Sequence, residues 1–264
     1  MKWKILIGIA IVVIAYFIVA ELDRQTIHAT PSYYYSNIQS KVALFNYFLH
    51  CNSAASVKGK SILRNPTADI FPHIQMVRDL YPILKQESVG AIRSAQPIKN
   101  EMFFEKIADD RWKRIYLKWY TPEFDEQALR LYPKTCKVLS TIPEVKLAMI
   151  SILEPGAFIS AHHGVFKGCL RYHLGISTPN DDKCFIEVDG EKYSWRDGED
   201  VMFDDTFQHS VANNTDQTRV ILFLDVERPM RNTFARSINS FCINKIAPWT
   251  TRSNNKQEKV EKQR

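Results

Sequence analysis

The sequence predicts an α+β protein in which an N-terminal membrane-anchor helix precedes an α-rich segment and then a jelly-roll of antiparallel strands. Three observations predict this order: an uncharged apolar run near the N-terminus, apolar residues at helical spacing between about residues 65 and 145, and short strand-like segments separated by turn residues after 145. A chain of 264 residues with 45% hydrophobic and 24% charged residues is typical of a folded globular body.

The apolar run extends from residue 5 to residue 20, between Lys2 and Lys4 on one side and a group of charges on the other. At helical rise it covers about 24 Å, slightly less than the roughly 30 Å hydrocarbon core of a bilayer, and flanking apolar residues extend it. We therefore predict a single anchor helix over 3–22. A cleavable signal peptide is the alternative, although the residues before Ala20 imitate a cleavage site only loosely.

The segment 23–145 is predicted to be α-rich and to pack on the core. In "HIQMVRDLYPILKQESVGAIRSA" apolar residues recur near helical spacing, with a break at Pro82, and "PKTCKVLSTI" repeats the pattern. Residues 24–60 mix aromatic and small polar residues. They predict short helices or turns that lie close to the membrane or against the domain.

Strand patterns dominate from residue 146 to residue 230, as in "KLAMISIL", "CFIEV" and "RVILFLDV". Asp189 and Gly190 separate "CFIEV" from "EKYSW" and predict a hairpin, because both positions tolerate positive φ. Many short antiparallel strands indicate a sandwich or barrel, here a jelly-roll. Residues 231–249 are a possible amphipathic helix, and 250–264 is a polar, charged tail that we expect to be disordered.

Charge and cysteine content say only a little about the partners of the protein and its cellular compartment. With 35 basic and 29 acidic residues the chain has a formal charge of +6, which favours anionic surfaces such as phosphate-bearing lipid or nucleic acid without separating them. The five cysteines show no short paired spacing. This indicates neither a zinc knuckle nor a disulfide framework and is typical of a reducing compartment.

Histidines concentrate in "SAHHGVFKGCLRYHLGIS". In a strand, neighbouring side chains alternate between faces, so only one of His162 and His163 can face the interior, whereas Arg171 and His173 share a face. His209, in "FDDTFQHS", is a third candidate that a neighbouring strand can bring close. A lone strand histidine is more often a hydrogen-bonded structural residue, but two imidazoles from two strands are a common platform for iron, copper or zinc.

The stretch "SILEPGAFISAHHGVFKGCLRYHLGIS", followed by "VDGEKYSWRDGEDVMFDDTFQHSVANNTDQTRVILFLDVERP", resembles the aspartyl/asparaginyl β-hydroxylase family of Fe(II)- and 2-oxoglutarate-dependent dioxygenases. The resemblance covers residues 151–229. Together with "RWKRIYLKWY", "LGISTPN" and the membrane segment, it is most similar to the lipid A 2-hydroxylase branch of bacteria. It implies a double-stranded β-helix, cupin-like catalytic core that uses Fe(II), 2-oxoglutarate and O2.

Carried over residue by residue, the resemblance implies that His162 and His209 are the catalytic iron ligands. Two neutral imidazoles leave coordination positions for a chelating 2-oxo acid, dioxygen and water. Arg219 suits the distal carboxylate of 2-oxoglutarate as a bidentate partner. The implied 2-oxoglutarate pocket consists of Ser151, Arg171, His173 and Arg219.

The common iron triad of such dioxygenases is His-x-Asp/Glu with a distant histidine, and the third position here is Gly164. Some similar proteins use water in place of that carboxylate, whereas others in the lipid A branch have an aspartate. His163 should face away from the metal. We expect Asp204 or Asp205 to orient His209 or to shape its turn, as acids behind metal ligands commonly do.

The resemblance implies decarboxylation of 2-oxoglutarate to succinate coupled to hydroxylation of a C–H bond, here at the 2-position of a secondary acyl chain of lipid A. The anchor helix, the basic charge and the sequence segments that resemble the lipid A branch favour this substrate. The alternatives are a peptidyl aspartyl/asparaginyl β-hydroxylase and a non-catalytic, membrane-anchored cupin-like binding module. We expect no nucleic-acid partner, and the sequence leaves the oligomeric state open.

Two arguments about membrane topology disagree. Lys2 and Lys4 ahead of the anchor favour a cytoplasmic N-terminus and an external domain. Fe(II) and 2-oxoglutarate are cytosolic, and free cysteines fit the cytoplasm. We therefore predict a single-pass protein of the inner membrane whose catalytic domain faces the cytoplasm.

Overall fold

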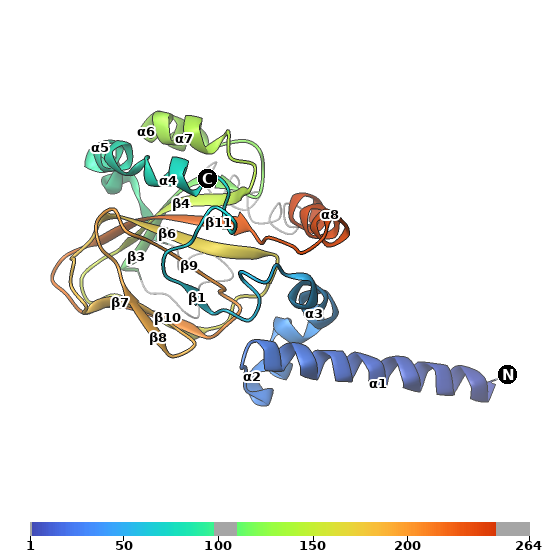
Figure 1. The fold of residues 1–264 in the computed structure, drawn as a ribbon. Coiled ribbons are helices and arrows are strands. Elements are labelled where there is room, and N and C mark those ends of the chain that lie inside the picture. Colours follow the sequence, from blue (N-terminus) through green and yellow to red (C-terminus); the bar gives the residue numbers. More distant parts are fainter. Residues whose placement is uncertain (1, 98–109, 247–264) are drawn as a thin grey trace, which may run out of the picture.

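The computed structural model describes residues 2–97 and 110–246. Two antiparallel sheets pack face to face, helices cover the outer face of the larger sheet, and one long helix projects from the body (Figure 1). The predicted α+β fold with a jelly-roll core is confirmed. The predicted tail 250–264 and the last three residues of the predicted helix 231–249 lie outside the described residues.

The larger sheet has seven strands and the smaller has four. Their orders in space are β1-β9-β6-β11-β4-β3-β2 and β5-β10-β7-β8. The strands of the larger sheet are β1 (Ile62–Leu63), β2 (Gln96–Pro97), β3 (Trp112–Trp119), β4 (Val145–Leu153), β6 (Cys169–Ser177), β9 (Asp200–Phe203) and β11 (Arg219–Glu227). Those of the smaller sheet are β5 (Phe158–His162), β7 (Cys184–Val188), β8 (Glu191–Ser194) and β10 (His209–Asn213).

Strand alternation gives the larger sheet two different faces. On β11, Val220 and Leu222 belong to the core beneath the helices, whereas Ile221 and Phe223 belong to the core between the sheets. Side chains two residues apart share a face. Arg219 therefore points into the sandwich with Ile221.

The predicted hairpin at Asp189 and Gly190 joins β7 to β8. Both residues have positive φ, 52° and 82°. A two-residue turn of this kind matches the twist of the strands it connects. The prediction is confirmed.

The helices over the larger sheet follow the predicted pattern, but Pro82 begins a helix rather than interrupting one. It stands in the first turn of α5, where backbone N–H groups have no partner within the helix, so the N–H that proline lacks is not needed. Pro133 begins α7 in the same way. The helices are α4 (Ile74–Arg78), α5 (Tyr81–Ala91), η2 (Ile92–Ser94), α6 (Glu126–Leu131) and α7 (Pro133–Leu139).

The sheet begins upstream of the expected boundary at residue 146, because "RWKRIYLKWY" contains strand β3. This strand pairs with β4 along most of its length. Its buried residues are Trp112, Ile115 and Leu117. The helical periodicity of the region belongs to the helices on either side of β3.

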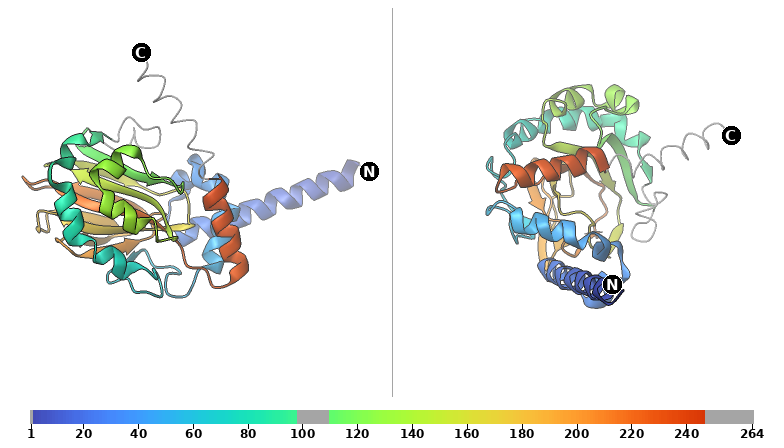
Figure 2. Two further views of the ribbon diagram at one scale, coloured as in Figure 1. Left: turned by 90° about the horizontal axis from the view of Figure 1, so that it is seen from above. Right: turned by 90° about the vertical axis from the view of Figure 1, so that its right-hand side faces the viewer.

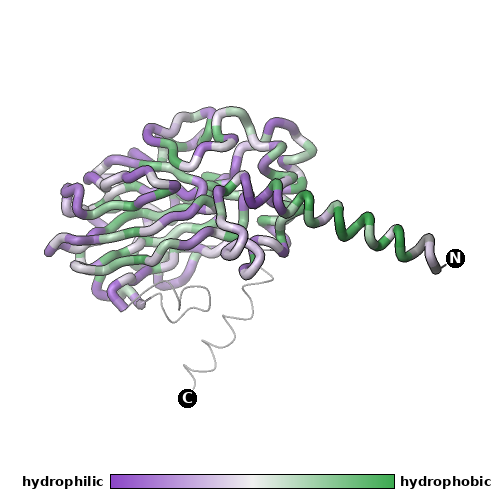
Figure 3. Tube along the Cα trace, turned by 90° about the horizontal axis from the view of Figure 1, so that it is seen from below, coloured by the Kyte–Doolittle hydropathy of each residue, from purple (hydrophilic) through white to green (hydrophobic). Residues whose placement is uncertain are grey.

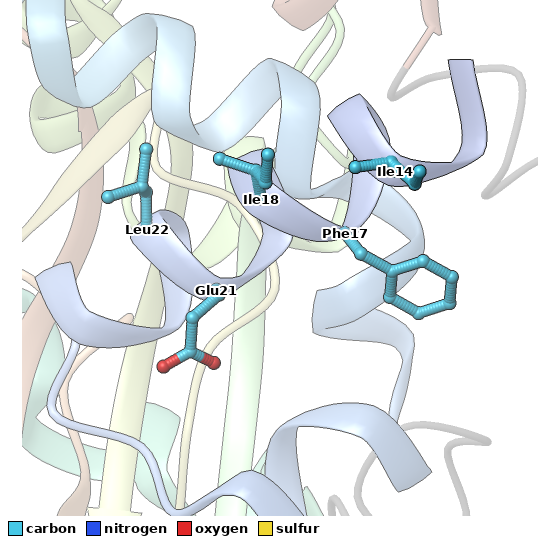
Figure 4. A pocket seen from close by; sticks show the side chains of 5 residues that line it. All are labelled: Ile14, Phe17, Ile18, Glu21 and Leu22. Carbon is cyan, nitrogen blue, oxygen red and sulfur yellow. The ribbon is translucent and has the colours of Figure 1, made fainter. Parts of the chain in front are cut away.

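The N-terminal helix α1 (Lys2–Thr26) projects from the body as an almost continuous apolar rod (Figure 3). Residues Leu6–Thr26 are long and apolar enough to cross a membrane, and 11% of their most apolar window is buried. Figure 4 shows a hollow on this helix lined by Ile14, Phe17, Ile18, Leu22 and Glu21. The Glu21 carboxylate lies 2.6 Å from Arg24, so charge begins near the body.

Three short helices follow α1 and pack between it and the sandwich. They are α2 (Pro31–Ser36), η1 (Ile38–Val42) and α3 (Ala43–Asn52). After the last strand come α8 (Thr233–Phe241) and the π-helical turn η3 (Cys242–Ile246).

A buried group of charges ties α1 to the sandwich. The Asp204 carboxylate lies 2.6 Å from the Arg228 guanidinium and 4.0 Å from the Lys167 ammonium, and all three side chains are buried. The Lys167 Nζ also donates to Thr26 Oγ1 at 3.3 Å. Burial would raise the pKa of Asp204, but the two cations outweigh it and lower that pKa. Removing one partner of such a group leaves the others buried and uncompensated.

We expect Arg228→Ala to lower the free energy of unfolding by about 3–5 kcal/mol, because the Asp204 carboxylate loses its nearest cation. Chemical denaturation of the detergent-purified protein, followed by circular dichroism, measures the change. The control is Arg196→Ala, which breaks an ion pair to the exposed Asp182 and should leave the midpoint almost unchanged. Equal shifts for the two variants would contradict the importance of the buried group.

Candidate active site

Two histidines face each other across the smaller sheet. His162 ends β5, His209 begins β10, they are register partners, and their ring centroids lie 4.1 Å apart. The Nδ1 of His162 bonds the Ser160 carbonyl at 2.7 Å, and that of His209 bonds the Phe207 carbonyl at 3.0 Å. A carbonyl can only accept, so each Nδ1 carries the proton and each Nε2 keeps a lone pair. The His209 Nε2 is buried and has no partner among the described residues.

Burial keeps both rings neutral. It lowers the pKa of His162 to about 4 and that of His209 well below its usual value. A neutral imidazole with a fixed Nδ1–H and an unused Nε2 is the form that binds Fe(II) and similar ions. The pair therefore fits the metal that the sequence predicts.

His163 points away from this pair, as strand alternation requires. Its Nδ1 bonds the Thr206 carbonyl at 2.8 Å, and its ring lies 4.8 Å from the ring of Tyr33 on α2. It is a structural neighbour of the site.

Gly164 has no room for a side chain. A Cβ there would lie 2.1 Å from Oδ2 of Asp205, and the Gly164 N–H donates to the Asp205 carbonyl at 2.7 Å. Asp205 is itself paired with Arg171 at 2.9 Å. Within residues 2–97 and 110–246 no cluster of three or more His, Cys, Asp or Glu is placed to hold a metal. The candidate ligand set is therefore the histidine pair, and position 164 offers no carboxylate beside it.

The other acid of this turn has the local role that we expected. The Asp204 Oδ1 accepts hydrogen bonds from the backbone N–H of Thr206 at 3.0 Å and from its hydroxyl at 2.6 Å. These bonds close the turn that leads into His209. Asp204 therefore shapes the turn, whereas Asp205 pairs with a cation of the site.

Arg219 is a buried cation without a carboxylate partner among the described residues. It is 2% exposed, its Nη2 donates to Ser151 Oγ at 3.0 Å, and its guanidinium lies 4.7 Å from the ring of Trp195. Its Nε has no partner in the same region. Burial lowers the pKa of Arg219 to about 10, so it is still charged at neutral pH. A charge in such surroundings is costly unless an anion joins it, which fits the distal carboxylate of 2-oxoglutarate.

Ser151 is oriented to donate a hydrogen bond. Its Oγ accepts from Arg219 Nη2 and from Trp112 Nε1, each at 3.0 Å. Both lone pairs are then used, and the hydroxyl proton is left for a third group such as a carboxylate. Trp112 was not predicted as a site residue, because an inward-facing tryptophan on a strand has the same pattern as an ordinary core residue.

His173 and Arg171 lie on one face of β6 but in different electrostatic settings. Both ring nitrogens of His173 are buried without a partner in the described part of the chain. Burial and the nearby Arg219 hold its pKa well below the usual value, so the ring is neutral. Arg171 instead lies 2.9 Å from Asp205 and 3.5 Å from Asp225. Burial alone would lower the pKa of Arg171, but these carboxylates outweigh it and raise that pKa.

The structure brings all six predicted site residues to one cavity between the sheets. The smaller sheet supplies the two facing histidines, and the larger sheet supplies the other four side chains. The lining residues are Trp112, Ser151, Ile159, His162, Arg171, His173, Ile186, Phe203, His209, Val211, Arg219 and Phe223.

The family model described as aspartyl/asparaginyl β-hydroxylase matches residues 78–229, more than half of the chain and the whole of this cavity. The chain belongs to the aspartyl/asparaginyl β-hydroxylase family. This confirms the family predicted from residues 151–229, and the match extends upstream through β3. The chain is thereby a member of a family of hydroxylases.

Two curated relatives differ in the substrates that their names state. An ornithine lipid ester-linked acyl 2-hydroxylase from Rhizobium tropici is 39% identical over 137 residues, 52% of this chain and 48% of that protein. The human aspartyl/asparaginyl β-hydroxylase is 32% identical over 123 residues, 45% of this chain and 16% of that protein. The chain thus spans about half or less of the length of these relatives.

Among solved structures, a prolyl-4-hydroxylase from Pseudomonas putida is similar with a TM-score of 0.40 and 15% identity. The similarity covers 64% of this chain and 93% of that one.

We expect the protein to develop a weak visible charge-transfer band on anaerobic titration with Fe(II) and 2-oxoglutarate, and His162→Ala to abolish it. Arg219→Met should weaken 2-oxoglutarate binding about a hundredfold or more, since a buried anion would lose its cation. His163→Ala is the matched control, because that ring faces away. Loss of the band in folded His163→Ala, or its survival in His162→Ala, would exclude the assigned histidine pair.

Proposed function

We propose that the protein is an Fe(II)- and 2-oxoglutarate-dependent dioxygenase that hydroxylates the 2-position of an acyl chain on a membrane lipid, with a secondary acyl chain of lipid A as the expected substrate. One observation carries the choice of a lipid. The turns that bear the two facing histidines are held by the chain segment that directly follows the apolar helix α1.

The turn after β5 is fixed by side chains of η1 and α3. Gln39 Nε2 donates to the His163 carbonyl at 2.9 Å, and Asn46 Nδ2 donates to the Val165 carbonyl at 2.9 Å. Both amides are buried. The backbone just beyond the first metal ligand therefore rests on the segment that continues α1.

The turn before β10 is held by a residue that lies just after the end of α1. The ring of His28 meets that of Phe207 edge-on at 5.3 Å, and its Nδ1 lies 3.0 Å from the Asp189 carboxylate. If α1 spans a bilayer, the candidate site lies close to the point where α1 enters the lipid. An acyl chain is available there, whereas a secreted or cytosolic peptide gains nothing from such placement.

Four of the six site residues have a defined task in this reaction. Bound Fe(II) would supply the oxidising chemistry, in which O2 places one oxygen in succinate and one on the acyl carbon while 2-oxoglutarate loses CO2. His162 and His209 would hold the metal. Arg219 would neutralise the distal carboxylate, and Ser151 would direct its hydroxyl proton toward the same acid. The aromatic walls exclude water, which strengthens both interactions.

The comparisons support a hydroxylase and allow two substrate classes. The Rhizobium tropici relative is named for an ester-linked acyl chain, and the human relative for aspartyl and asparaginyl side chains. The apolar α1 and the formal charge of +6 favour a phosphate-bearing lipid. The acyl 2-hydroxylase is the better supported of the two.

Expression in a bacterium that lacks acyl 2-hydroxylation should add one oxygen atom to a secondary acyl chain of lipid A, and His162→Ala should add none. Mass spectrometry of purified lipid A measures both. The same extracts are searched for hydroxylated ornithine lipid, which would keep the reaction and change the substrate. A hydroxylated aspartyl or asparaginyl peptide with unmodified lipids would instead support the peptidyl alternative.

We further propose that α1 is a single-pass anchor in the inner membrane, with the catalytic domain in the cytoplasm. Fe(II) and 2-oxoglutarate are available there, and the five cysteines are free thiols, which suits a reducing compartment. Lys2 and Lys4 favour the opposite orientation, but they are only two charges, and Arg24 partly offsets them.

Protease added to intact spheroplasts should leave the catalytic domain whole, because the inner membrane shields it. Lysis of the spheroplasts should expose it to cleavage. Immunoblotting of the domain records both results, with a periplasmic protein as the positive control for digestion. Cleavage of the domain before lysis would reverse the proposed topology.

A further inference from the structure

The apolar part of α1 that stands clear of the body, which begins after Lys2 and Lys4, is shorter than the hydrocarbon core of a bilayer. The body flanks it from Tyr16 onward, since the Tyr16 hydroxyl donates to the Ser40 carbonyl and Ala20 is fully buried. The part before this contact, from Trp3 to residue 15, is about 20 Å long at helical rise. The hydrocarbon core is roughly 30 Å thick. The surface around the base of α1 must therefore lie in the interfacial region if α1 is an anchor.

Two helices lie at that level and run across the direction of α1. Figure 2 shows α3 and α8 on the side of the body from which α1 projects, and the view along α1 shows both lying across that side. They touch each other, with the rings of Phe48 and Phe234 edge-on at 6.5 Å. With α1 along the membrane normal, α3 and α8 lie in the plane of the membrane surface.

The outer surface of these helices carries large apolar side chains that water would contact. Leu44 of α3 is 55% exposed, and Phe234 and Phe241 of α8 are 70% and 61% exposed. The two phenylalanines are seven residues apart, which places them on one face of the helix. Exposed aromatic side chains on one face of a short helix are typical of a segment that rests on a bilayer surface.

The inner surface of the same two helices holds the turn that follows the first metal ligand. Asn46 Oδ1 accepts from the Lys167 N–H at 3.1 Å, and Asn239 Nδ2 donates to the Gly168 carbonyl at 2.8 Å. Both asparagines are buried. A contact on the outside of α3 and α8 is therefore one helix diameter from the backbone that positions the site.

We propose that Leu44, Phe234 and Phe241 form a docking surface that rests in the headgroup region of a phospholipid bilayer. This docking surface orients the candidate site toward the lipid beside α1. The inference rests on the proposed anchoring of α1 but not on the proposed reaction. It adds a second, orienting contact to the anchor.

Nitroxide labels on the full chain test the docking surface. Cys51 and Cys242 are only half-buried, so both are first changed to serine, and single labels are then attached through Phe234→Cys or Phe241→Cys. The control label uses Leu129→Cys, since Leu129 is also an exposed apolar residue, 49% accessible, but lies on α6 over the larger sheet. Each protein is reconstituted in vesicles of phosphatidylethanolamine and phosphatidylglycerol.

We expect labels at positions 234 and 241 to collide more often with O2, which concentrates in lipid, than with a water-soluble nickel chelate. The label at position 129 should show the reverse. Equal, water-like accessibility at all three positions would overturn the docking surface, and retention of the protein in vesicles after carbonate washing would show that the anchor itself stands. Extraction by carbonate would overturn both. If the labels at positions 234 and 241 are shielded from both reagents in detergent as well as in vesicles, another part of the protein covers them. That result would also overturn the docking surface.

Discussion

One face of the larger sheet is apolar and packs under the helices, whereas the other carries charged side chains and faces the smaller sheet. Because side chains alternate between the two faces of a strand, each face keeps its own kind of residue. Toward the helices β11 presents an unbroken apolar row, while toward the smaller sheet it presents Arg219 and Asp225 among apolar neighbours. A shift of one residue in register would place a charge beneath the helices. The helical layer therefore fixes the strand register, and the register places the site.

The two arginines inside the sandwich differ in whether the protein itself balances their charge. Arg171 lies against two carboxylates, so its charge is balanced by the protein itself. Arg219 is more deeply buried but has a hydroxyl and an indole face instead of an acid. A fold that tolerates an uncompensated guanidinium pays for it in stability unless a ligand supplies the missing charge. The same logic applies to the unpartnered nitrogens of His173 and His209.

The sequence predicted the features that depend on local rules. Alternation along β6 separated Arg171 and His173 from their neighbours, and the Asp189–Gly190 turn followed from backbone preference alone. The pairing of His162 with His209 needed the family resemblance, because 46 residues and several strands separate them. The segment "RWKRIYLKWY" was compatible with an amphipathic strand or with a lipid-headgroup contact, and the structure shows strand β3 there. The role of Trp112 was not predicted, because an inward-facing tryptophan on a strand has the same pattern as a core residue. The clash that excludes a side chain at Gly164 depends on a distant turn and is visible only in three dimensions.

The elements that favour a lipid substrate lie outside the part of the chain that defines the family. The family match begins at residue 78 and ends at 229, whereas α1, α3 and α8 lie before and after it. Yet these flanking helices, through Gln39, Asn46 and Asn239, hold the turn that follows the first histidine. The shared core thus accounts for the chemistry, which relatives with lipid and peptide names have in common. In the function proposed for this chain, the flanking helices bring the substrate bond to the core. Substrate choice would then depend on how these helices hold the core at the membrane, and not on the histidine pair.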